Sequence, residues 1–223
     1  MNTASWLSLV HSQRVIAVIR APSLDLGLHM AKAVAEGGMK LIEITWNTHE
    51  AAKLIHLLRN ELPACIIGAG TILTLDHWWE AIAAGSQFLF TPHINLEMIQ
   101  IAVNQQVPIV PGALTPTEIV NAWQAGATAV KVFPVESLGG PTYLNHLQGP
   151  LGQIPLIPTG GITVENAKAF IEAGALAVGL SSHLFPKQAI VAENWAEITE
   201  RTKTLLRSLS SSVNSSGVSG VNR

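Results

Sequence analysis

Short apolar runs alternate with longer amphipathic stretches along most of this 223-residue chain. Eight runs have the length and the β-branched content of strands: 15–19, 40–45, 65–67, 87–91, 107–110, 128–133, 155–157 and 175–180. Between them lie stretches with the apolar period of helices: 24–36, 50–61, 75–84, 96–105, 117–125 and 164–173. A strand followed by a helix, many times over, predicts an α/β fold of parallel strands joined by right-handed crossovers.

Four glycines mark the ends of predicted helices at regular intervals. Gly37, Gly85, Gly126 and Gly174 each stand between a helical stretch and the next strand, where glycine supplies a left-handed C-cap. The same 89 residues separate the first from the third (37 to 126) and the second from the fourth (85 to 174). Two halves of four units in register favour a closed TIM (β/α)8 barrel over an open doubly wound sheet.

The two ends of the chain differ from this repeating core. Residues 1–13 predict a short amphipathic helix, with Trp6, Leu7 and Val10 on one side, that closes the bottom of the barrel. Residues 208–223 are rich in Ser and Gly and lack a period, so they predict a disordered, dispensable tail. The expected organisation is a single domain over residues 1–207 followed by that tail.

Composition narrows both the fold and the class of partner. The chain is 48% apolar and 13% charged, with a formal net charge of −2. That apolar share excludes disorder of the whole chain, and strands with so few charges fit a doubly covered sheet better than a half-exposed β-sandwich. The balanced charge includes no basic stripe to neutralise phosphates, so we expect no nucleic-acid partner.

Cysteine and targeting signals point to one compartment. Cys65 is the only cysteine, so no intrachain disulfide can form. Arg14 and Arg20 interrupt the apolar residues near the start of the chain, and no apolar run reaches the roughly 20 residues that a membrane span needs. We therefore expect a soluble, cytoplasmic protein with no membrane partner.

Two ionisable residues interrupt otherwise apolar strands. Glu43 stands in the run LIEIT and Lys131 in the run AVKVF, and burying either group unpaired costs several kcal/mol. Their strands are the second and the sixth of eight, which face each other across a narrow barrel. The alternatives to a catalytic role are a structural ion pair between them, or a side chain that reaches solvent at a strand end.

A lysine and a glutamate at one barrel mouth suit carbon–carbon bond chemistry. Burial lowers the basicity of a lysine, and its neutral amine can attack a carbonyl to form a Schiff base. A carboxyl group whose pKa is raised by burial can move the protons of that reaction. The eight histidines show no HExxH motif or repeated ligand spacing, so we expect no metal and no cofactor.

Glycine-rich loops follow the seventh and eighth predicted strands. Gly160 and Gly161 follow the seventh strand, and Ser181 and Ser182 follow Gly179 at the end of the eighth. These loops are the usual phosphate site of TIM barrels, because glycine lets backbone N–H groups approach an anion. The alternative is an ordinary turn between strand and helix that Thr163 caps.

Further residues are expected around the same mouth. Arg20 closes the first strand and suits a bidentate contact with a carboxylate, although a surface role is the alternative. Thr71 follows a tight Gly-Ala-Gly turn from which its hydroxyl can reach the site. We expect Trp46, Pro92 and Phe133 to wall the pocket, and the tryptophans at helical positions to serve packing.

Taken together, these motifs resemble the family of 2-keto-3-deoxy-6-phosphogluconate (KDPG) and 2-keto-4-hydroxyglutarate (KHG) aldolases. The motifs occur in order over residues 15–185: VIR at 18–20, EIT at 43–45, GAGT at 68–71, TPH at 91–93, PG at 111–112 with TPTE at 115–118, KVFP at 131–134 and PTGG at 158–161. The resemblance implies a class I aldolase on a TIM barrel that forms a homotrimer and releases pyruvate from a small 2-keto-3-deoxy acid.

The resemblance also implies roles for individual residues. Lys131 resembles the Schiff-base lysine and Glu43 the general acid/base. Arg20, Thr71 and Thr159 resemble the residues around the carboxylate and keto carbon of the pyruvyl group. The residues that resemble the phosphate site are Gly160, Gly161, Ser182 and, as a serine where the family often has glycine, Ser181. Some members have an arginine where this chain has Asn47. The resemblance implies that here Arg20, at the position that the other branch uses, takes the carboxylate.

Three functional hypotheses follow. The first is a class I aldolase that cleaves KDPG to pyruvate and glyceraldehyde 3-phosphate, or KHG to pyruvate and glyoxylate; a variant of it acts on 2-keto-3-deoxy-6-phosphogalactonate. The second is a catalytically silent barrel that binds phosphosugars through its glycine loops. An isomerase or epimerase is the third, and it needs a second acid/base or a metal for which the sequence shows no residues.

Overall fold

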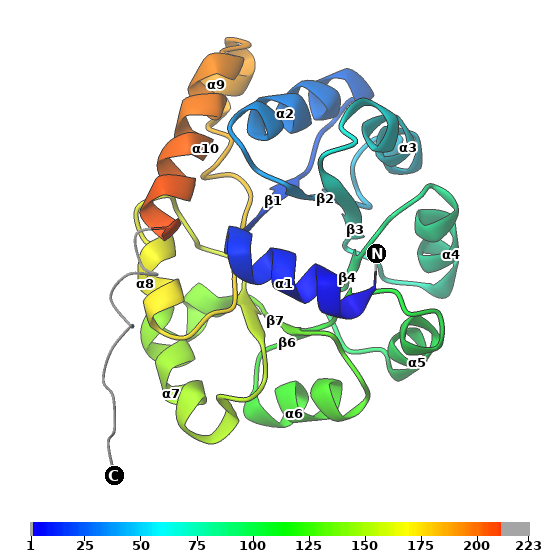
Figure 1. Cartoon of the computed structure of the whole chain (residues 1–223), viewed down its shortest axis with the longest axis vertical. Coiled ribbons are helices and arrows are strands. Elements are labelled where there is room, and N and C mark those ends of the chain that lie inside the picture. The colour runs from blue at the N-terminus through cyan, green and yellow to red at the C-terminus, as the bar shows by residue number, and fades with distance from the viewer. Residues whose placement is uncertain (1, 211–223) are drawn as a thin grey trace.

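The strands form a closed parallel barrel in the computed structural model, which describes residues 2–210 (Figure 1). They are β1 Val15–Ile19, β2 Leu41–Thr45, β3 Ile66–Gly70, β4 Leu89–Phe90, β5 Ile109–Val110, β6 Gly112–Ala113, β7 Val130–Val132, β8 Leu156–Pro158 and β9 Val178–Leu180. Hydrogen bonds order them as β5-β4-β3-β2-β1-β9 and as β6-β7-β8.

Two local features turn these two sheets into one ring. Only Pro111 separates β5 from β6, so the two segments form one barrel strand, and the carbonyl of Pro111 still accepts from Lys131 N of β7 at 2.9 Å. A parallel bridge between Thr159 and Gly179 joins the end of β8 to β9. The ring therefore has eight strands, and the prediction of a TIM-type (β/α)8 barrel is confirmed.

Helices surround the ring (Figure 1). They are α2 Leu24–Glu36, α3 Ala51–Glu61, α4 Leu75–Ala83, α5 Leu96–Asn104, α6 Pro116–Gln124, α7 Pro141–Leu151, α8 Ala167–Glu172, α9 Lys187–Val191 and α10 Trp195–Ser210, with a 3-10 turn, η1, at Val135–Leu138. Side chains before four of them cap the first turn: Ser23, Thr74, Asn95 and Thr115. None of the helices in residues 2–210 has the length and apolar character of a membrane span.

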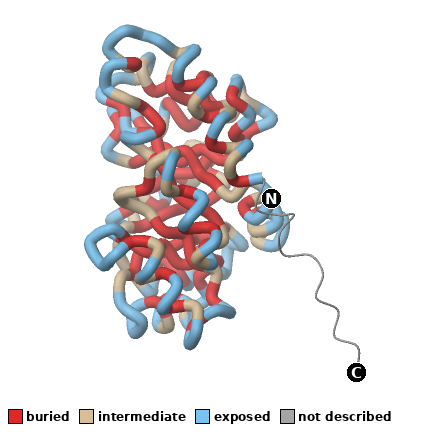
Figure 2. The backbone as a smooth tube through the Cα atoms, turned by 90° about the vertical axis from the view of Figure 1, so that its left-hand side faces the viewer, coloured by how far each residue is buried: buried red, intermediate tan, exposed pale blue. Residues whose placement is uncertain are grey.

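Burial explains why the strands are so apolar. All five residues of β1 and of β2 are buried, because the outer helices cover one face and the barrel interior the other. Figure 2 shows buried backbone throughout the interior, with exposed segments at the periphery. A charged side chain in the middle of such a strand is therefore withdrawn from bulk water.

The N-terminal helix α1, Thr3–Gln13, lies across one end of the barrel (Figure 1). Trp6 and Val10 are fully buried there, and the Trp6 ring centroid lies 5.5 Å from that of Phe88. Leu7 packs against the same cluster of barrel-interior residues. The predicted closure of the barrel bottom by this helix is confirmed.

The prediction for one of the four capping glycines is wrong. Gly85, Gly126 and Gly174 have φ angles near +100°, but Gly37 is right-handed at −69°, and Gly38, at +97°, takes the left-handed position. Gly37 is needed for packing instead, since a Cβ there would lie 2.5 Å from Thr202 Cβ of α10. The 89-residue spacing of caps thus holds for the second pair of glycines only.

The predicted start of the tail is also wrong. Helix α10 continues through Ser208 to Ser210, and Leu209 is buried against the core, because its apolar period runs three residues past the predicted boundary. The rest of the predicted tail, 211–223, lies outside the described residues, so its predicted disorder stays a prediction.

Candidate active site

Lys131 and Glu43 line one cavity of about 320 Å³ at the carboxyl ends of the strands. Glu43, in the middle of β2, is 2% exposed, and Lys131, in the middle of β7, is 7% exposed. The barrel ring brings these two strands to opposite sides of the interior, as the sequence predicted.

A glycine on the neighbouring strand makes room for the glutamate. Thr45 of β2 pairs with Gly70 of β3, so Gly70 lies beside the end of β2. A Cβ built at Gly70 would lie 1.7 Å from Glu43 Oε1, a distance at which the two atoms would overlap. The carboxyl group therefore occupies space that only glycine leaves free.

The two side chains do not form a structural ion pair. Within residues 2–210, none of the ion pairs at 4.0 Å or less joins Lys131 to Glu43. Glu43 Oε1 is buried without a hydrogen-bond partner among the described residues, and Lys131 Nζ lies 4.7 Å from the centre of the Phe133 ring. Neither alternative from the sequence, an ion pair or a side chain in solvent, describes this arrangement.

Burial shifts the pKa of each group in the direction that favours its neutral form. It raises the pKa of the Glu43 carboxyl, against the opposing positive charges of Lys131 and Arg20. It lowers the pKa of the Lys131 ammonium, with Glu43 opposing that shift and Arg20 adding to it. Both shifts favour the uncharged forms, a neutral amine and a protonated carboxyl group, which are the states that nucleophilic attack and proton transfer need.

The structure brings all eleven predicted site residues to the same cavity. Besides the lysine and glutamate they are Arg20, Thr71, Pro92, Phe133, Thr159, Gly160, Gly161, Ser181 and Ser182. They come from the ends of β1, β3, β7, β8 and β9 and from the loop after β4. This convergence follows from the closed ring, since the carboxyl ends of parallel strands meet at one mouth.

The glycines of the loop after β8 have conformations that other residues adopt at a cost. Gly160 and Gly161 have φ angles of +91° and +84°. A Cβ at Gly161 would also lie 1.8 Å from Glu136 Oε2 of η1, so the two segments pack closely. Nearby, Thr163 Oγ1 accepts from Asn166 N at 3.1 Å and caps the following turn. The predicted turn is therefore present, and the two glycines before it line the cavity.

Sequence reasoning missed several residues that line the cavity: Val18, Thr45, Ile162, Gly179 and His183. The alternation of side chains along a strand could have found two of them, because Val18 and Thr45 stand two positions from Arg20 and Glu43 and so share their faces. His183 directly follows Ser182 in the loop after β9, where no periodic pattern indicates which way a side chain points.

The tryptophan predictions are partly wrong. Trp46 does not line the cavity of Lys131 and Glu43; the centroid of its ring lies 5.9 Å from that of His77 in α4. Trp78 is fully buried, as packing requires, but Trp79 and Trp123 are 48% and 36% exposed. A helical position alone did not distinguish the inner face from the outer one.

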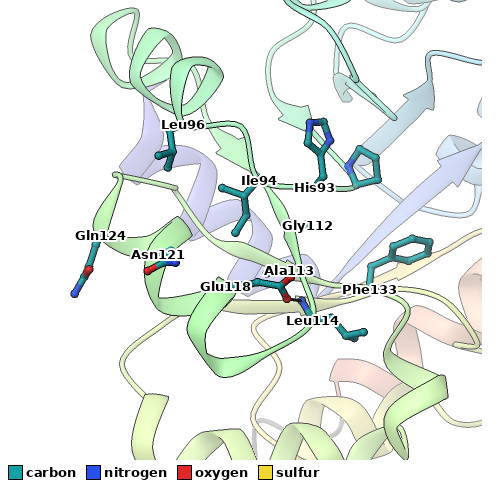
Figure 3. Close-up of a pocket in the computed structure, with 11 residues that line it drawn as sticks. His93, Ile94, Leu96, Gly112, Ala113, Leu114, Glu118, Asn121, Gln124 and Phe133 are labelled. Atoms are coloured by element: carbon teal, nitrogen blue, oxygen red, sulfur yellow. Dashed lines mark hydrogen bonds between the residues drawn. The ribbon is translucent and has the colours of Figure 1, made fainter.

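A larger hollow of about 770 Å³ adjoins the site but lacks its chemistry. It lies between the start of α5 and one side of α6, with Phe133 at its edge (Figure 3). Its lining includes no lysine or arginine, and the carboxylate of Glu118 is engaged by the backbone N–H groups of Leu114 and Thr115. Nor do the described residues include three His, Cys, Asp or Glu side chains grouped as metal ligands.

Comparison with known families agrees with this geometry. A family model described as KDPG and KHG aldolase matches residues 7–201. The chain belongs to the KDPG and KHG aldolase family. This aldolase is 34% identical over 197 residues to the 2-dehydro-3-deoxy-phosphogluconate aldolase of Haemophilus influenzae, across 88% of this chain and 93% of that protein. It is 31% identical over 193 residues to the KHG/KDPG aldolase of Escherichia coli K12, across 86% and 91%.

Solved structures of similar sequence share the fold. A KDPG aldolase from Legionella pneumophila, with pyruvate captured as a covalent carbinolamine, superimposes with a TM-score of 0.81 at 30% identity, covering 89% of this aldolase and 97% of that chain. A native KDPGal structure gives a TM-score of 0.80 at 30% identity, covering 89% and 95%.

Proposed function

We propose that this aldolase cleaves KDPG to pyruvate and glyceraldehyde 3-phosphate through a Schiff base on Lys131. The observation that carries the proposal is a buried lysine of lowered pKa that lines one cavity with a buried carboxyl group and forms no ion pair within the described part of the chain. The covalent pyruvate adduct in the Legionella relative supports the same chemistry.

The reaction begins at the keto carbon. The neutral Lys131 amine adds to C2, and the carbinolamine loses water as Glu43 supplies the proton to the departing hydroxyl. The product is a protonated imine, which accepts electrons. The Glu43 carboxylate left behind then takes the proton of the C4 hydroxyl, the C3–C4 bond breaks, and its electron pair moves to the imine nitrogen as an enamine.

The second half reverses the proton movement. The aldehyde leaves, Glu43 returns its proton to C3 of the enamine, and water hydrolyses the resulting imine to pyruvate and the free lysine. One carboxyl group thus alternates as acid and base, which requires that both of its forms be accessible. The opposing effects of burial and of the two neighbouring cations on its pKa favour that balance.

Binding groups are divided between the two ends of the cavity. Arg20 suits the substrate carboxylate, with Thr71 and Thr159 beside the pyruvyl group and Pro92 and Phe133 as walls. The N–H groups and hydroxyls of the loops after β8 and β9 suit a phosphate: Gly160, Gly161, Ser181 and Ser182. Substrates of the KHG type lack the phosphate and would use the first end only.

Trapping of the imine tests the proposal directly. Incubation with pyruvate and borohydride is expected to add one pyruvyl mass at Lys131, located by peptide mass spectrometry. Lys131→Met should abolish the label, whereas Lys53→Met, an exposed lysine of α3, should keep it. An unlabelled wild-type chain that still binds sugar phosphates would support the silent barrel instead.

Comparison of kcat/KM for several 2-keto acids identifies the preferred substrate. We expect kcat/KM to be higher for KDPG than for KHG and for the 2-keto-3-deoxy-6-phosphogalactonate epimer, since the loops offer a phosphate site and the curated relatives include KDPG aldolases. A preference for KHG would show that Ser181 weakens the anion site, and Ser181→Gly should then restore activity on KDPG.

We also propose that the protein works in the cytoplasm as a homotrimer. Leu96 is 61% exposed and lies with the exposed ring of Phe133 around the larger hollow, an apolar surface that a second copy would cover (Figure 3). Light scattering is expected to give three times the 23.7 kDa mass of the chain, and a monomer would contradict the assembly.

A further inference from the structure

Arg20, at the end of β1, makes one hydrogen bond with a side chain of the next strand's loop. Its Nε donates to Oδ1 of Asn47 at 3.2 Å. Within residues 2–210 its terminal amino groups make no hydrogen bond or ion pair. Arg20 lines the catalytic cavity, whereas Asn47 does not.

The guanidinium group is planar and rigid, and a carboxylate can bind to either of two edges. One edge carries Nε and a terminal amino group, and the other carries both terminal amino groups. The bond to Asn47 occupies the Nε side. A carboxylate in the cavity is therefore left the end-on arrangement, in which each oxygen accepts from one terminal amino group. The bond also restricts rotation of a long side chain that is otherwise exposed to solvent.

Asn47 can hold the arginine because its own loop is tied to the end of β1. Thr45 Oγ1 and Thr48 Oγ1 donate to the carbonyl of Ile19 at 3.1 and 3.4 Å, and Thr48 Oγ1 accepts from Ala21 N at 3.3 Å. The backbone N of His49 donates to the carbonyl of Ala21 at 3.0 Å. These bonds flank Arg20 and Asn47 on both sides, and Thr45 and Thr48 are buried.

We propose that Asn47 is the positioning residue of Arg20: it fixes the guanidinium so that its two terminal amino groups face the cavity and bind the substrate carboxylate end-on. This inference rests on the proposed function, in which Arg20 binds that carboxylate. Asn47 itself touches no substrate, so its whole effect passes through the arginine.

The consequence is selective for carboxylate ligands. Asn47→Ala should raise the pyruvate concentration for half-maximal borohydride labelling of Lys131 about 5-fold, and leave the labelling at saturation unchanged. With methyl pyruvate, which has no carboxylate, the variant and the wild type should match. The matched control is Asn60→Ala, an exposed asparagine whose side chain bonds only within α3, and it should behave as the wild type with both ligands.

A double-substitution cycle tests whether Asn47 acts through Arg20. Arg20→Ala should raise the half-maximal pyruvate concentration more than Asn47→Ala does, and Arg20→Ala/Asn47→Ala should be no worse than Arg20→Ala alone. Asn47 is exposed, so the melting temperature of its variant should stay within about 2 °C of the wild type.

The outcomes separate the two proposals. Additive effects, or an equal loss with methyl pyruvate, would overturn the positioning role while leaving the Schiff base intact. A labelled wild type with an unchanged Asn47→Ala variant would do the same. A wild type that pyruvate never labels would overturn the proposed function, and the role of Asn47 with it.

Discussion

At the scale of single residues, Lys131 is unfavourable for folding and useful for chemistry. Its amine is withdrawn from water by β7 and by the barrel interior, with no ion pair within residues 2–210 to compensate. In the unfolded chain this lysine keeps its proton up to its ordinary pKa, whereas in the folded protein it loses the proton at a lower pH. The reactive amine is thus maintained at the expense of stability.

Lys131→Met should therefore stabilise the protein while it abolishes imine formation. We expect the free energy of unfolding at neutral pH to rise by about 0.5–2 kcal/mol, because an apolar chain of similar length replaces the buried amine. The gain should be largest below the folded-state pKa of Lys131 and should fade as pH approaches 10.5, where the unfolded lysine also loses its proton. Urea denaturation at several pH values measures this; a variant less stable than the wild type at pH 7 would refute it.

The neighbours of Lys131 should move its titration in opposite directions. Labelling by pyruvate needs the neutral amine, so its rate rises as pH passes the pKa of Lys131. Glu43 raises that pKa and Arg20 lowers it, so Glu43→Gln should shift the midpoint of the rate profile to lower pH and Arg20→Ala to higher pH. The measurement is the initial labelling rate from pH 5 to 10, and shifts of the same sign in both variants would contradict the electrostatic account.

At the scale of elements, β3 shapes the site without supplying the acid or the amine. Gly70→Ala should displace the Glu43 carboxyl, since the new methyl group would overlap Oε1. We expect the rate of pyruvate labelling to fall on the order of 100-fold, the cost of misplacing a reacting group by about 1 Å. The matched control is Gly149→Ala in α7, where a Cβ meets nothing within 4 Å and activity should persist.

At the scale of the whole molecule, α1 closes the barrel at the end opposite the site. Trp6→Ala should lower the free energy of unfolding by about 3–5 kcal/mol because it leaves a large cavity among the interior residues that include Phe88 and Phe90. Labelling of the folded variant by pyruvate should persist. Trp79→Ala, a half-exposed tryptophan, should cost much less in the same chemical denaturation experiment.

The elements that the sequence predicted best are those whose whole length follows one period. The bounds of β1 and α2 match the prediction residue by residue. The predicted helical stretches omit α7, because Gly149 and Pro150 interrupt its pattern. Of α10 they give only the helical position of Trp195, because buried Thr199 and Thr202 replace apolar residues on the inner face of that helix. The spacing of apolar residues predicts which face of a helix is buried only where the buried residues are themselves apolar.

By itself the sequence determined the repeated strand and helix, the closure by α1, and the two charges that apolar strands cannot hold without cause. These features are local, since the apolar period and the isolated charges can be recognised from residues that are close together in the sequence. Only the tertiary structure decided that Lys131 and Glu43 form no ion pair with each other, that Gly70 makes room for the carboxyl group, and that Asn47 bonds to Arg20. Those contacts join residues 27 or more positions apart, and the register and twist of the strands in the closed barrel decide them.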